Sequence, residues 1–496
     1  MGDAIVFPKD ISKTKDLILP QLGSIVGGNL RTQGETFDCE NPANGEVICS
    51  LPSASDQVVD EAVACAREAY GGVWRAMSPG KRQRLLTKLS ALIEENKDNL
   101  SLLESSENGV PLSVVRSFSV AALAKNIGYY ASWIDKLHGS VVPLSSSGAL
   151  DYVVNEPYGV VALVTAYNTP SLFLGSKAGP ALAAGNCVVI KPSPMASLPA
   201  LRFAELASQA GIPDGVVNVV LGGAKVSSTL VSHKGIDLVS FTGSGEAGRH
   251  VSHLAAENLT PIALELGGKS PDIVFGDATL SKVTMGACIG AFALSGQACV
   301  AGSRLYVESS VVDGVTESLV KFANSLPIGE PSDPSVVLGP LISAAHRERV
   351  EQMIANAQDQ GAKVLCGGDR IGGLLSNGYY LRPAVVNEVS SKCDIYRQEV
   401  FGPVLTISAF DNEEQAIELA NNTPYGLGAG IWTNDLSRAH RVASRLHAGT
   451  VWVNSYGVVP HTAPFGGFKQ SGNAREGGIW GLMTYLQHKN VYIDLG

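Results

Sequence analysis

Residues 236–248 read IDLVSFTGSGEAG, and this stretch decides the fold that the sequence predicts. Its first six residues are typical of a short buried strand, the glycines after them indicate a turn, and a helix to about Ala255 follows. Backbone N–H groups at the start of such a helix can bind a phosphate. The spacing of Gly243, Gly245 and Gly248 differs from the G-x-G-x-x-G dinucleotide fingerprint, so this motif alone identifies no ligand.

Short apolar strands alternate with helices on both sides of this stretch. We expect strands at 160–165, 187–190, 216–220, 262–266 and 304–307, and a helix at 200–210. The alternation predicts a mostly parallel sheet covered on both faces, with a nucleotide at the carboxyl ends of its strands. Further helices are expected at 56–70 with Asp56 as its cap, at 81–96 and at 114–137, whereas 139–156 and 483–495 indicate extended strands that pair with each other or with another subunit.

The composition excludes several classes of protein. The net charge of -9 and the lack of a dense run of lysine and arginine argue against nucleic acid as a partner. The N-terminal sequence MGDAIVFPKD is not a signal peptide, and no run is long and apolar enough to span a membrane, so we expect a cytoplasmic protein. The eight scattered cysteines contain no CxxC pair and fit a reducing compartment, and no metal site is indicated.

Two residues are candidates for covalent chemistry. Cys299 follows an apolar helical run and lies among small residues, which leave room for a substrate; an inert buried thiol is the alternative. Glu265 ends an apolar strand before two glycines. Partial desolvation there would raise the pKa of its carboxyl group toward neutrality, as a general base requires; a salt-bridged structural residue is the alternative.

Two polar residues end other buried strands. The amide of Asn168 can donate to a developing oxyanion or cap the turn before Pro170. Lys191 can donate to ribose or phosphate oxygens, or lie solvated at a turn. The residues by themselves leave both alternatives open.

Taken in order, these segments resemble the aldehyde dehydrogenase superfamily, in its NAD(P)-dependent, hydrolytic form. The resemblance extends from about Asn41 to the C-terminal tail. It rests on ten blocks: TAYNTP, AGPALAAGNCVVIKPSP, GIPDGVVNVVLG, FTGSGEAG, LELGGKSP, GQACVAGSR, EVFGPV, NNTPYGLGAG, GTVWVN and PFGGFKQSG.

The resemblance implies a role for each matching residue. Cys299 would be the nucleophile, Asn168 and the N–H of Cys299 the oxyanion hole, and Glu265 the base that activates water for thioester hydrolysis. The implied cofactor contacts come from ten residues: Thr165, Ala166, Lys191, Ser193, Gly243, Ser244, Gly248, Leu266, Glu399 and Phe401. The implied substrate tunnel is lined by Thr169, Phe173, Ser176, Ala298, Val300, Val459, His461 and Phe465.

The resemblance also implies an α/β fold of three parts. They are a Rossmann-like dinucleotide-binding domain (1–138 and 157–266), an α/β catalytic domain (267–472) and a small β arm for oligomerisation (139–156 and 473–496). A homodimer or homotetramer that acts on a small-molecule aldehyde is expected.

Some positions depart from the family pattern. Pro194 replaces a frequent Glu that would accept from the ribose hydroxyls, so NAD is favoured while NADP stays open. Thr169, Ser176 and Val459 are small where many members carry aromatic residues, which predicts a wide tunnel for a bulky or aromatic, hydrophobic aldehyde. His461 and Tyr456 are candidates for polar contacts, and no arginine or lysine obviously marks the tunnel for a carboxylated semialdehyde.

Two other functions remain possible from the sequence. A CoA-acylating semialdehyde dehydrogenase shares the fold, but Glu265 argues for hydrolysis. A non-enzymatic structural or binding member of the fold is the second, and the presence of Cys299, Glu265 and Asn168 argues against it.

Overall fold

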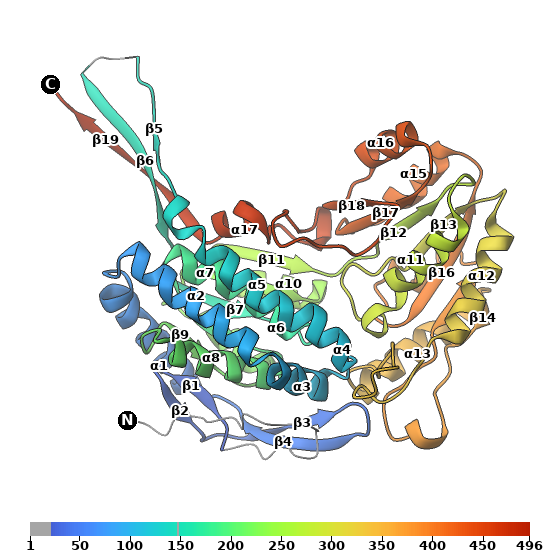
Figure 1. The fold of residues 1–496 in the computed structure, drawn as a ribbon, viewed down its shortest axis with the longest axis horizontal. Coiled ribbons are helices and arrows are strands. Elements are labelled where there is room, and N and C mark those ends of the chain that lie inside the picture. Colours follow the sequence, from blue (N-terminus) through green and yellow to red (C-terminus); the bar gives the residue numbers. More distant parts are fainter. Residues whose placement is uncertain (1–20, 146–147) are drawn as a thin grey trace.

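The computed structural model describes residues 21–145 and 148–496. The N-terminal segment in which the sequence indicates no signal peptide lies outside the described residues. Figure 1 shows two bodies, each built on a β-sheet, and a ribbon of strands that projects from one of them.

The first sheet has seven strands and forms the dinucleotide-binding type of core that the sequence predicted. Five parallel strands lie in the order β11-β10-β7-β8-β9, and the antiparallel strands β1 and β2 extend it. Their bounds are β1 Ser24–Val26, β2 Asn29–Arg31, β7 Val160–Val164, β8 Cys187–Lys191, β9 Val217–Val219, β10 Leu238–Gly243 and β11 Ile262–Leu266. Almost every residue of β7 to β10 is buried, because helices pack on the sheet.

The second sheet also has seven strands, in the order β14-β15-β16-β13-β12-β17-β18, and all but β14 are parallel. Their bounds are β12 Pro271–Val274, β13 Arg304–Glu308, β14 Lys363–Cys366, β15 Ala384–Asn387, β16 Val404–Phe410, β17 Gly428–Trp432 and β18 Thr450–Val453. A smaller hairpin joins β3 (Thr36–Asn41) to β4 (Glu46–Pro52).

The projecting ribbon contains both segments that were expected to be extended. β19 (Leu486–Asp494) pairs antiparallel with β6 (Ala149–Pro157), and β5 (Ser140–Val141) pairs with the other edge of β6. The expected pairing between the two segments is therefore confirmed within one chain. The strands of each large sheet lie within one predicted part, and the ribbon lies within the predicted arm except for Pro157, the last residue of β6; the division of the chain at the predicted boundaries stays a prediction.

The helices cover the sheets and link their strands. In the first body they are α1 Asp56–Ala69, η2 Tyr70–Trp74, α2 Pro79–Glu95, α3 Lys97–Asn108, α4 Leu112–Val114, η3 Val115–Ser119, α5 Val120–Ala131, η4 Ile134–Lys136, α6 Pro170–Phe173, η5 Leu174–Ala178, α7 Gly179–Ala184, α8 Leu198–Ala210, α9 Ala224–Val231 and α10 Gly245–Ala256. The remaining ones are α11 Leu280–Phe292, η6 Ala293–Gly296, α12 Val312–Ser325, α13 Ala344–Asp359, η7 Gly373–Leu375, α14 Asp394–Arg397, α15 Glu413–Asn421, α16 Leu436–Arg445, η8 Lys469–Ser471 and α17 Gly478–Met483.

Two local predictions were wrong. Asp56 is not the cap of α1: the Oγ of Ser55 accepts from the N–H of Val58, and Asp56 lies in the first turn, where its charge suits the helix dipole. The helix expected at 114–137 is divided into α4, the π-helical η3, α5 and η4. Apolar periodicity alone does not report such a change of pitch.

Parallel register aligns the ends of the strands that carry the candidate residues. Gly243 of β10 pairs with Leu266 of β11, and Val164 of β7 pairs with Lys191 of β8. The segments after these strands therefore meet at one edge of the sheet, as the sequence predicted. In the described part of the chain, no helix combines the length and apolar character that a membrane crossing needs.

Candidate active site

A cavity of about 940 Å³ opens at this edge and is completed by loops from the second body. It brings together the three predicted catalytic residues Asn168, Glu265 and Cys299. It also contains six of the predicted cofactor residues, Ala166, Gly243, Ser244, Leu266, Glu399 and Phe401, and all eight predicted tunnel residues, Thr169, Phe173, Ser176, Ala298, Val300, Val459, His461 and Phe465.

Other sequence candidates lie near the cavity without lining it. Thr165 and Lys191 are buried, and the N–H of Thr165 donates to the carbonyl of Lys191. The Oγ of Ser193 accepts from the N–H of Met195 in the turn after β8. Gly248, on α10, faces Leu266 of β11: a Cβ atom at Gly248 would lie 2.6 Å from the Leu266 side chain, so the glycine allows helix and strand to pack closely, and its place at the cofactor stays a prediction.

Tyr456, the other candidate for a polar contact, does not line the cavity. Its hydroxyl donates to the carbonyl of Val300 over 2.8 Å. It supports the polypeptide next to Cys299 from behind.

A tight turn presents Cys299 to the cavity. Leu294, Ser295 and Gly296 all have positive φ, and a Cβ atom at Gly296 would lie 2.1 Å from the carbonyl oxygen of Gly402. Cys299 as a whole residue is partly exposed, although its sulfur is largely shielded from solvent. Burial and the neighbouring carboxylates of Glu399, Glu265 and Glu476 raise the pKa of the Cys299 thiol, so attack requires a base or added positive charge.

Asn168 is held beside this turn by its amide group. Its Nδ2 donates to the carbonyl of Gln297 over 2.8 Å, and Gln297 in turn accepts from the N–H of Ile342. Nδ2 carries two hydrogens, so this bond fixes the direction of the amide while leaving one N–H for an oxyanion.

Glu265 lies at the end of β11 and is 5% exposed. Neither carboxylate oxygen has a hydrogen-bond partner among the described residues. Burial, with a smaller effect of Glu476, raises the pKa of Glu265 well above its usual value, while Lys177 and Arg475 oppose the rise. A desolvated carboxylate without a partner is suited to accept a proton.

Glu399 is also a buried carboxylate, but its position is fixed. Its Oε1 accepts from the N–H of Gly268 over 3.1 Å, and a Cβ atom at Gly267 would lie 1.9 Å from its Oε2. Arg349 donates to the carbonyls of Glu399 and Val400. Burial raises the pKa of Glu399 to about 7.

The chain is similar in sequence to known proteins. Residues 30–491 match the profile of the aldehyde dehydrogenase family. The chain is 40% identical to the putative aldehyde dehydrogenase DhaS of Bacillus subtilis over 93% of each chain, and 40% identical to an aldehyde dehydrogenase of Aspergillus niger over 99% of this chain and 98% of that one.

Solved structures agree with these relatives. An aldehyde dehydrogenase from Bacillus cereus in complex with NAD+ superposes with a TM-score of 0.95 at 37% identity, over 99% of this chain and 100% of that chain. A betaine aldehyde dehydrogenase from Staphylococcus aureus in complex with NAD+ gives 0.94 at 34% identity, over 96% and 98%.

The chain belongs to the aldehyde dehydrogenase family. This confirms the predicted family, the α/β fold and the class of enzyme, an oxidoreductase that acts on aldehydes. The family assignment leaves the role of each residue as a proposal.

The structure of this aldehyde dehydrogenase adds site residues that the sequence did not indicate. Lys177 and Glu476 form an ion pair of 2.8 Å beside Glu265, and their side chains are 1% and 11% exposed. The only signal for Lys177 was a single lysine inside the apolar run 172–184. Glu476 falls in the segment assigned to the oligomerisation arm, so the tail from 473 to 485 contributes to the site before β19 begins.

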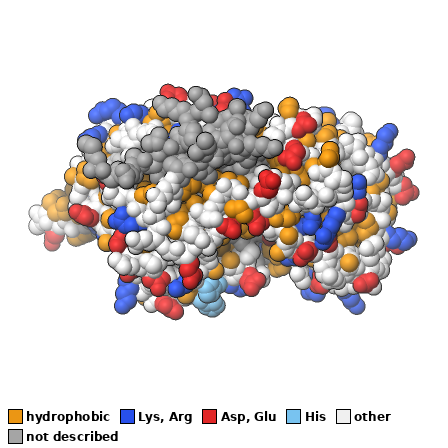
Figure 2. Space-filling view, turned by 90° about the horizontal axis from the view of Figure 1, so that it is seen from below, with side chains coloured by type: hydrophobic (Ala, Val, Ile, Leu, Met, Phe, Trp, Pro, Cys, Tyr) orange, Lys and Arg blue, Asp and Glu red, His pale blue; other side chains and the backbone are white. Residues whose placement is uncertain are grey.

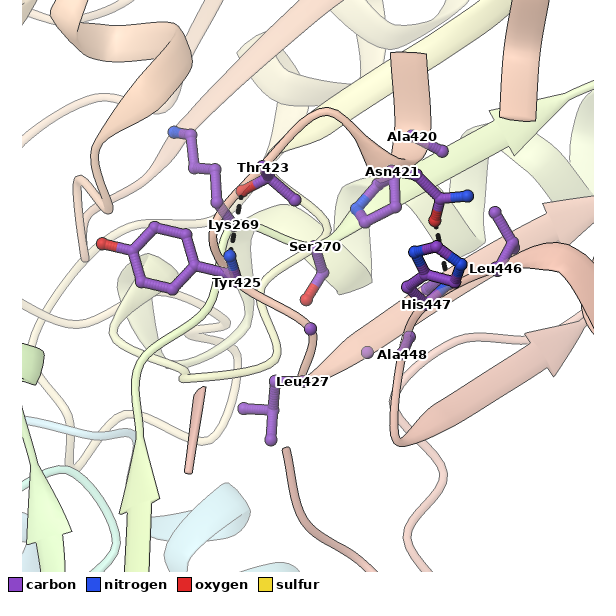
Figure 3. A pocket seen from close by; sticks show the side chains of 14 residues that line it. Lys269, Ser270, Ala420, Asn421, Thr423, Tyr425, Leu427, Leu446, His447 and Ala448 are labelled. Atoms are coloured by element: carbon purple, nitrogen blue, oxygen red, sulfur yellow. Dashed lines mark hydrogen bonds between the residues drawn. The ribbon is translucent and has the colours of Figure 1, made fainter. Parts of the chain in front are cut away.

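A second cavity of the dehydrogenase is too small for a substrate. It measures about 10 Å³, roughly the space of a single water molecule, and Lys269, Ser270, Asn421 and His447 contribute to its lining (Figure 3). Asn421 accepts from the N–H of His447 across it. The chemistry therefore belongs to the larger cavity.

Two observations on the described residues concern nucleic acids and metals. Figure 2 shows acidic and basic side chains interspersed on the visible face, without a continuous basic patch. Within residues 21–145 and 148–496, no group of three or more His, Cys, Asp or Glu side chains is arranged to hold a metal ion.

Proposed function

We propose that this enzyme oxidises an aldehyde to its carboxylic acid through a thiohemiacetal and a thioester on Cys299, and that water activated by Glu265 hydrolyses the thioester. The observation that carries the proposal is the convergence of Cys299, Asn168 and an unpartnered Glu265 in one cavity. Of the buried carboxylates that line the cavity in the described chain, Glu265 alone is engaged by neither a hydrogen bond nor an ion pair.

The chemistry divides into two stages. Cys299 first loses its thiol proton to a water molecule that acts as the base, and the thiolate sulfur then adds to the carbonyl carbon, while the free N–H of the Asn168 amide and the backbone N–H of Cys299 stabilise the oxyanion. Loss of a hydride leaves the thioester. Glu265 then takes a proton from water as the water attacks, and the acid leaves with the thiol regenerated.

A nicotinamide dinucleotide supplies the hydride acceptor, and the residues present fit it. The N–H groups of Gly245 and Glu246, at the start of the 12-residue helix α10, have no acceptor among the described residues, and both residues line the cavity. Such N–H groups bind a pyrophosphate. Glu399 and Phe401 would hold the nicotinamide riboside, with Lys191 and Ser193 near the adenosine ribose.

We favour NAD, with NADP as the alternative. The NAD+ complexes of the Bacillus cereus and Staphylococcus aureus relatives support NAD. Pro194 offers no carboxylate that would repel a 2′-phosphate, so a measurable rate with NADP is compatible with the site.

We propose a bulky or aromatic, hydrophobic aldehyde as substrate. Thr169, Ser176 and Val459 line the cavity with small side chains, and Phe173 and Phe465 supply apolar walls. A CoA-acylating semialdehyde dehydrogenase is the alternative, which the unpartnered Glu265 disfavours because CoA, and not an activated water, would release the acyl group. A non-enzymatic role is disfavoured by the assembled site.

A cytoplasmic homo-oligomer is proposed for the protein as a whole. The ribbon of β5, β6 and β19 exposes Val141, Leu150, Tyr492 and Ile493, which is the kind of surface that a second subunit covers. Whether two or four subunits assemble is measured by light scattering.

The decisive experiment measures reduced nicotinamide formation with aliphatic, aromatic and semialdehyde substrates, each with NAD and with NADP. We expect turnover that disappears in Cys299→Ala and a product that is the free acid with or without CoA. Turnover that survives in Cys299→Ala would show that Cys299 is not the nucleophile. An acyl-CoA product would favour the CoA-acylating semialdehyde dehydrogenase. Higher rates with acetaldehyde than with benzaldehyde would contradict the proposal of a wide tunnel.

A further inference from the structure

The sequence showed no cation that marks the substrate tunnel, but the structure provides one. Lys125, on α5, lines the same cavity as Cys299. It is exposed, and no hydrogen bond or ion pair engages its amine in the described part of the protein. The signal was missed because Lys125 lies more than forty positions before the nearest quoted tunnel residue, in the helix expected at 114–137, to which the sequence assigned no role in the site.

A histidine from a distant loop lies next to this lysine. His461 stacks edge-on against Tyr129, one helical turn after Lys125, with ring centroids 5.1 Å apart. Both side chains line the same cavity, and burial together with the positive charge of Lys125 lowers the pKa of His461. Lys125 thus supplies a full positive charge and His461 an N–H donor.

The acidic groups of the cavity lie elsewhere. Glu476 is paired with Lys177, Glu265 ends β11, Glu399 is bound to Gly268, and Glu246 lies on α10 at the proposed cofactor end. Arg249 and Arg349 belong to that same end: Arg249 is on α10, and Arg349 holds the backbone of Glu399. Lys125 therefore faces the substrate tunnel without a carboxylate of the protein to neutralise it.

The geometry points to an anion subsite formed by Lys125 and His461 at the outer end of the tunnel, and we propose that the preferred substrate is an aldehyde that carries a carboxylate at the end remote from its carbonyl group. This inference rests on the proposed function and sharpens its substrate class. Phe118, Ala121 and Val459 line the same cavity, so an apolar body fits between the reacting carbonyl and the charged end.

The test compares kcat/KM for matched aldehydes that differ only in the remote charge. The probes are para-formylbenzoate and ω-oxooctanoate, each against its methyl ester. We expect the wild type to have a higher kcat/KM for the carboxylates than for their esters. Lys125→Met keeps most of the aliphatic stem and removes the charge, so it should reduce this preference about two- to fivefold, the size of effect expected of an exposed charge pair. Lys125→Glu should reverse the preference, and added salt should weaken it in the wild type.

The control variant is Lys282→Met, an exposed lysine of α11 that does not line the cavity. It should leave the ratio of carboxylate to ester unchanged. A wild type that favours the esters, or a ratio unmoved in Lys125→Met, would overturn the anion subsite while leaving aldehyde oxidation in place.

Failure of the proposed function would look different, because neither member of a pair would then be oxidised. In that case, calorimetry on Cys299→Ala compares the binding of terephthalate with that of its monomethyl ester. Tighter binding of terephthalate that is lost on adding Lys125→Met supports the subsite, and equal binding overturns it.

Discussion

The two buried carboxylates at the centre of the cavity differ in whether the protein donates hydrogen bonds to them. Glu265 lies in a pocket where neither oxygen has a hydrogen-bond partner, while Glu399 accepts from the N–H of Gly268 and its backbone is held by Arg349. Burial raises the pKa of both carboxyl groups. A raised pKa therefore does not distinguish a base from a binding group, whereas hydrogen-bond satisfaction does.

The difference follows from local sequence. Gly267 and Gly268 allow the backbone to approach Glu399 closely enough for its carboxylate to be bound, and a Cβ atom at either glycine would collide with a neighbour. Glu265 lies just before them with its side chain on the cavity face of β11. The four consecutive residues 265–268 thus create one free carboxylate and one fixed one.

The largest expected effect comes from removing the free carboxylate. Glu265→Gln should lower steady-state turnover at least about a hundredfold, the usual contribution of a general base, because the thioester is no longer hydrolysed. The first turnover should survive as a burst of reduced nicotinamide that is stoichiometric with enzyme. Stopped-flow absorbance measures both, and unchanged turnover, or loss of the burst together with turnover, would contradict the assigned role.

The fixed carboxylate should respond differently to the same substitution. Glu399→Gln should raise the KM for the dinucleotide about tenfold, because an interaction with the bound cofactor is weakened. Hydrolysis of a para-nitrophenyl ester by Cys299, which needs no cofactor, should be little affected, in contrast to Glu265→Gln. If both variants lost ester hydrolysis equally, the distinction between free and fixed carboxylates would fail.

Much of this arrangement could be predicted from the sequence because strand ends and glycine turns are local signals. Glu265, Asn168 and the turn at Gly243 each follow an apolar strand, and parallel register brings such ends together. Cys299 and Glu399 lie on loops, where pattern alone predicts little, and their roles came from resemblance to the family. That resemblance covers short blocks and is silent about the residues between them.

The residues that were missed act through contacts between segments distant in sequence. Lys177 pairs with Glu476 across 299 positions, and Lys125 and His461, which are 336 positions apart, line the same cavity. No period or motif reports such pairs, because they depend on how the tail folds back over the first body. The pitch change in η3 was missed for a related reason, since tertiary packing selects it.

The charge of Glu476 should affect the pH dependence of hydrolysis through Glu265. Burial is the main cause of the raised pKa of Glu265, and the negative charge of Glu476 adds to it. Glu476→Gln should therefore lower the pKa of Glu265. Because hydrolysis needs ionised Glu265, the midpoint of its rise with pH should move to lower pH.

The measurement is the pH dependence of single-turnover acyl-enzyme hydrolysis. Glu317→Gln, an exposed residue of α12, serves as the control and should leave the midpoint in place. Thermal melting checks that the unpaired Lys177 has not unfolded the protein. A midpoint that moves to higher pH would show that the field of Glu476 does not act on Glu265.

A smaller effect is expected where a side chain only positions the oxyanion donor. Asn108, the last residue of α3, donates from Nδ2 to the carbonyl of Asn168 over 3.3 Å, and its Oδ1 accepts from the N–H of Val110. Asn108→Asp keeps the acceptor and removes the donor, so kcat should fall about three- to tenfold while the KM for the dinucleotide is unchanged. Asn108→Ala also loses the hydrogen bond from the N–H of Val110 and should therefore lower the stability of the protein as well. An unaltered kcat in the folded Asn108→Asp variant would show that Asn168 is held by Gln297 alone.

The smallest expected effect concerns stability, and it has the opposite sign to activity. Glu265 has a higher pKa folded than its unfolded value of about 4.3, so its ionisation costs stability increasingly as pH rises above that value. Glu265→Gln should therefore stabilise the protein by about 1 kcal/mol at pH 8 and not at pH 4. Glu399→Gln should gain less, because the bond from Gly268 already favours the ionised form. Calorimetric melting of both variants at both pH values tests this. A larger gain in stability for Glu399→Gln than for Glu265→Gln would show that Glu399, and not Glu265, is the carboxylate that lacks hydrogen-bond partners.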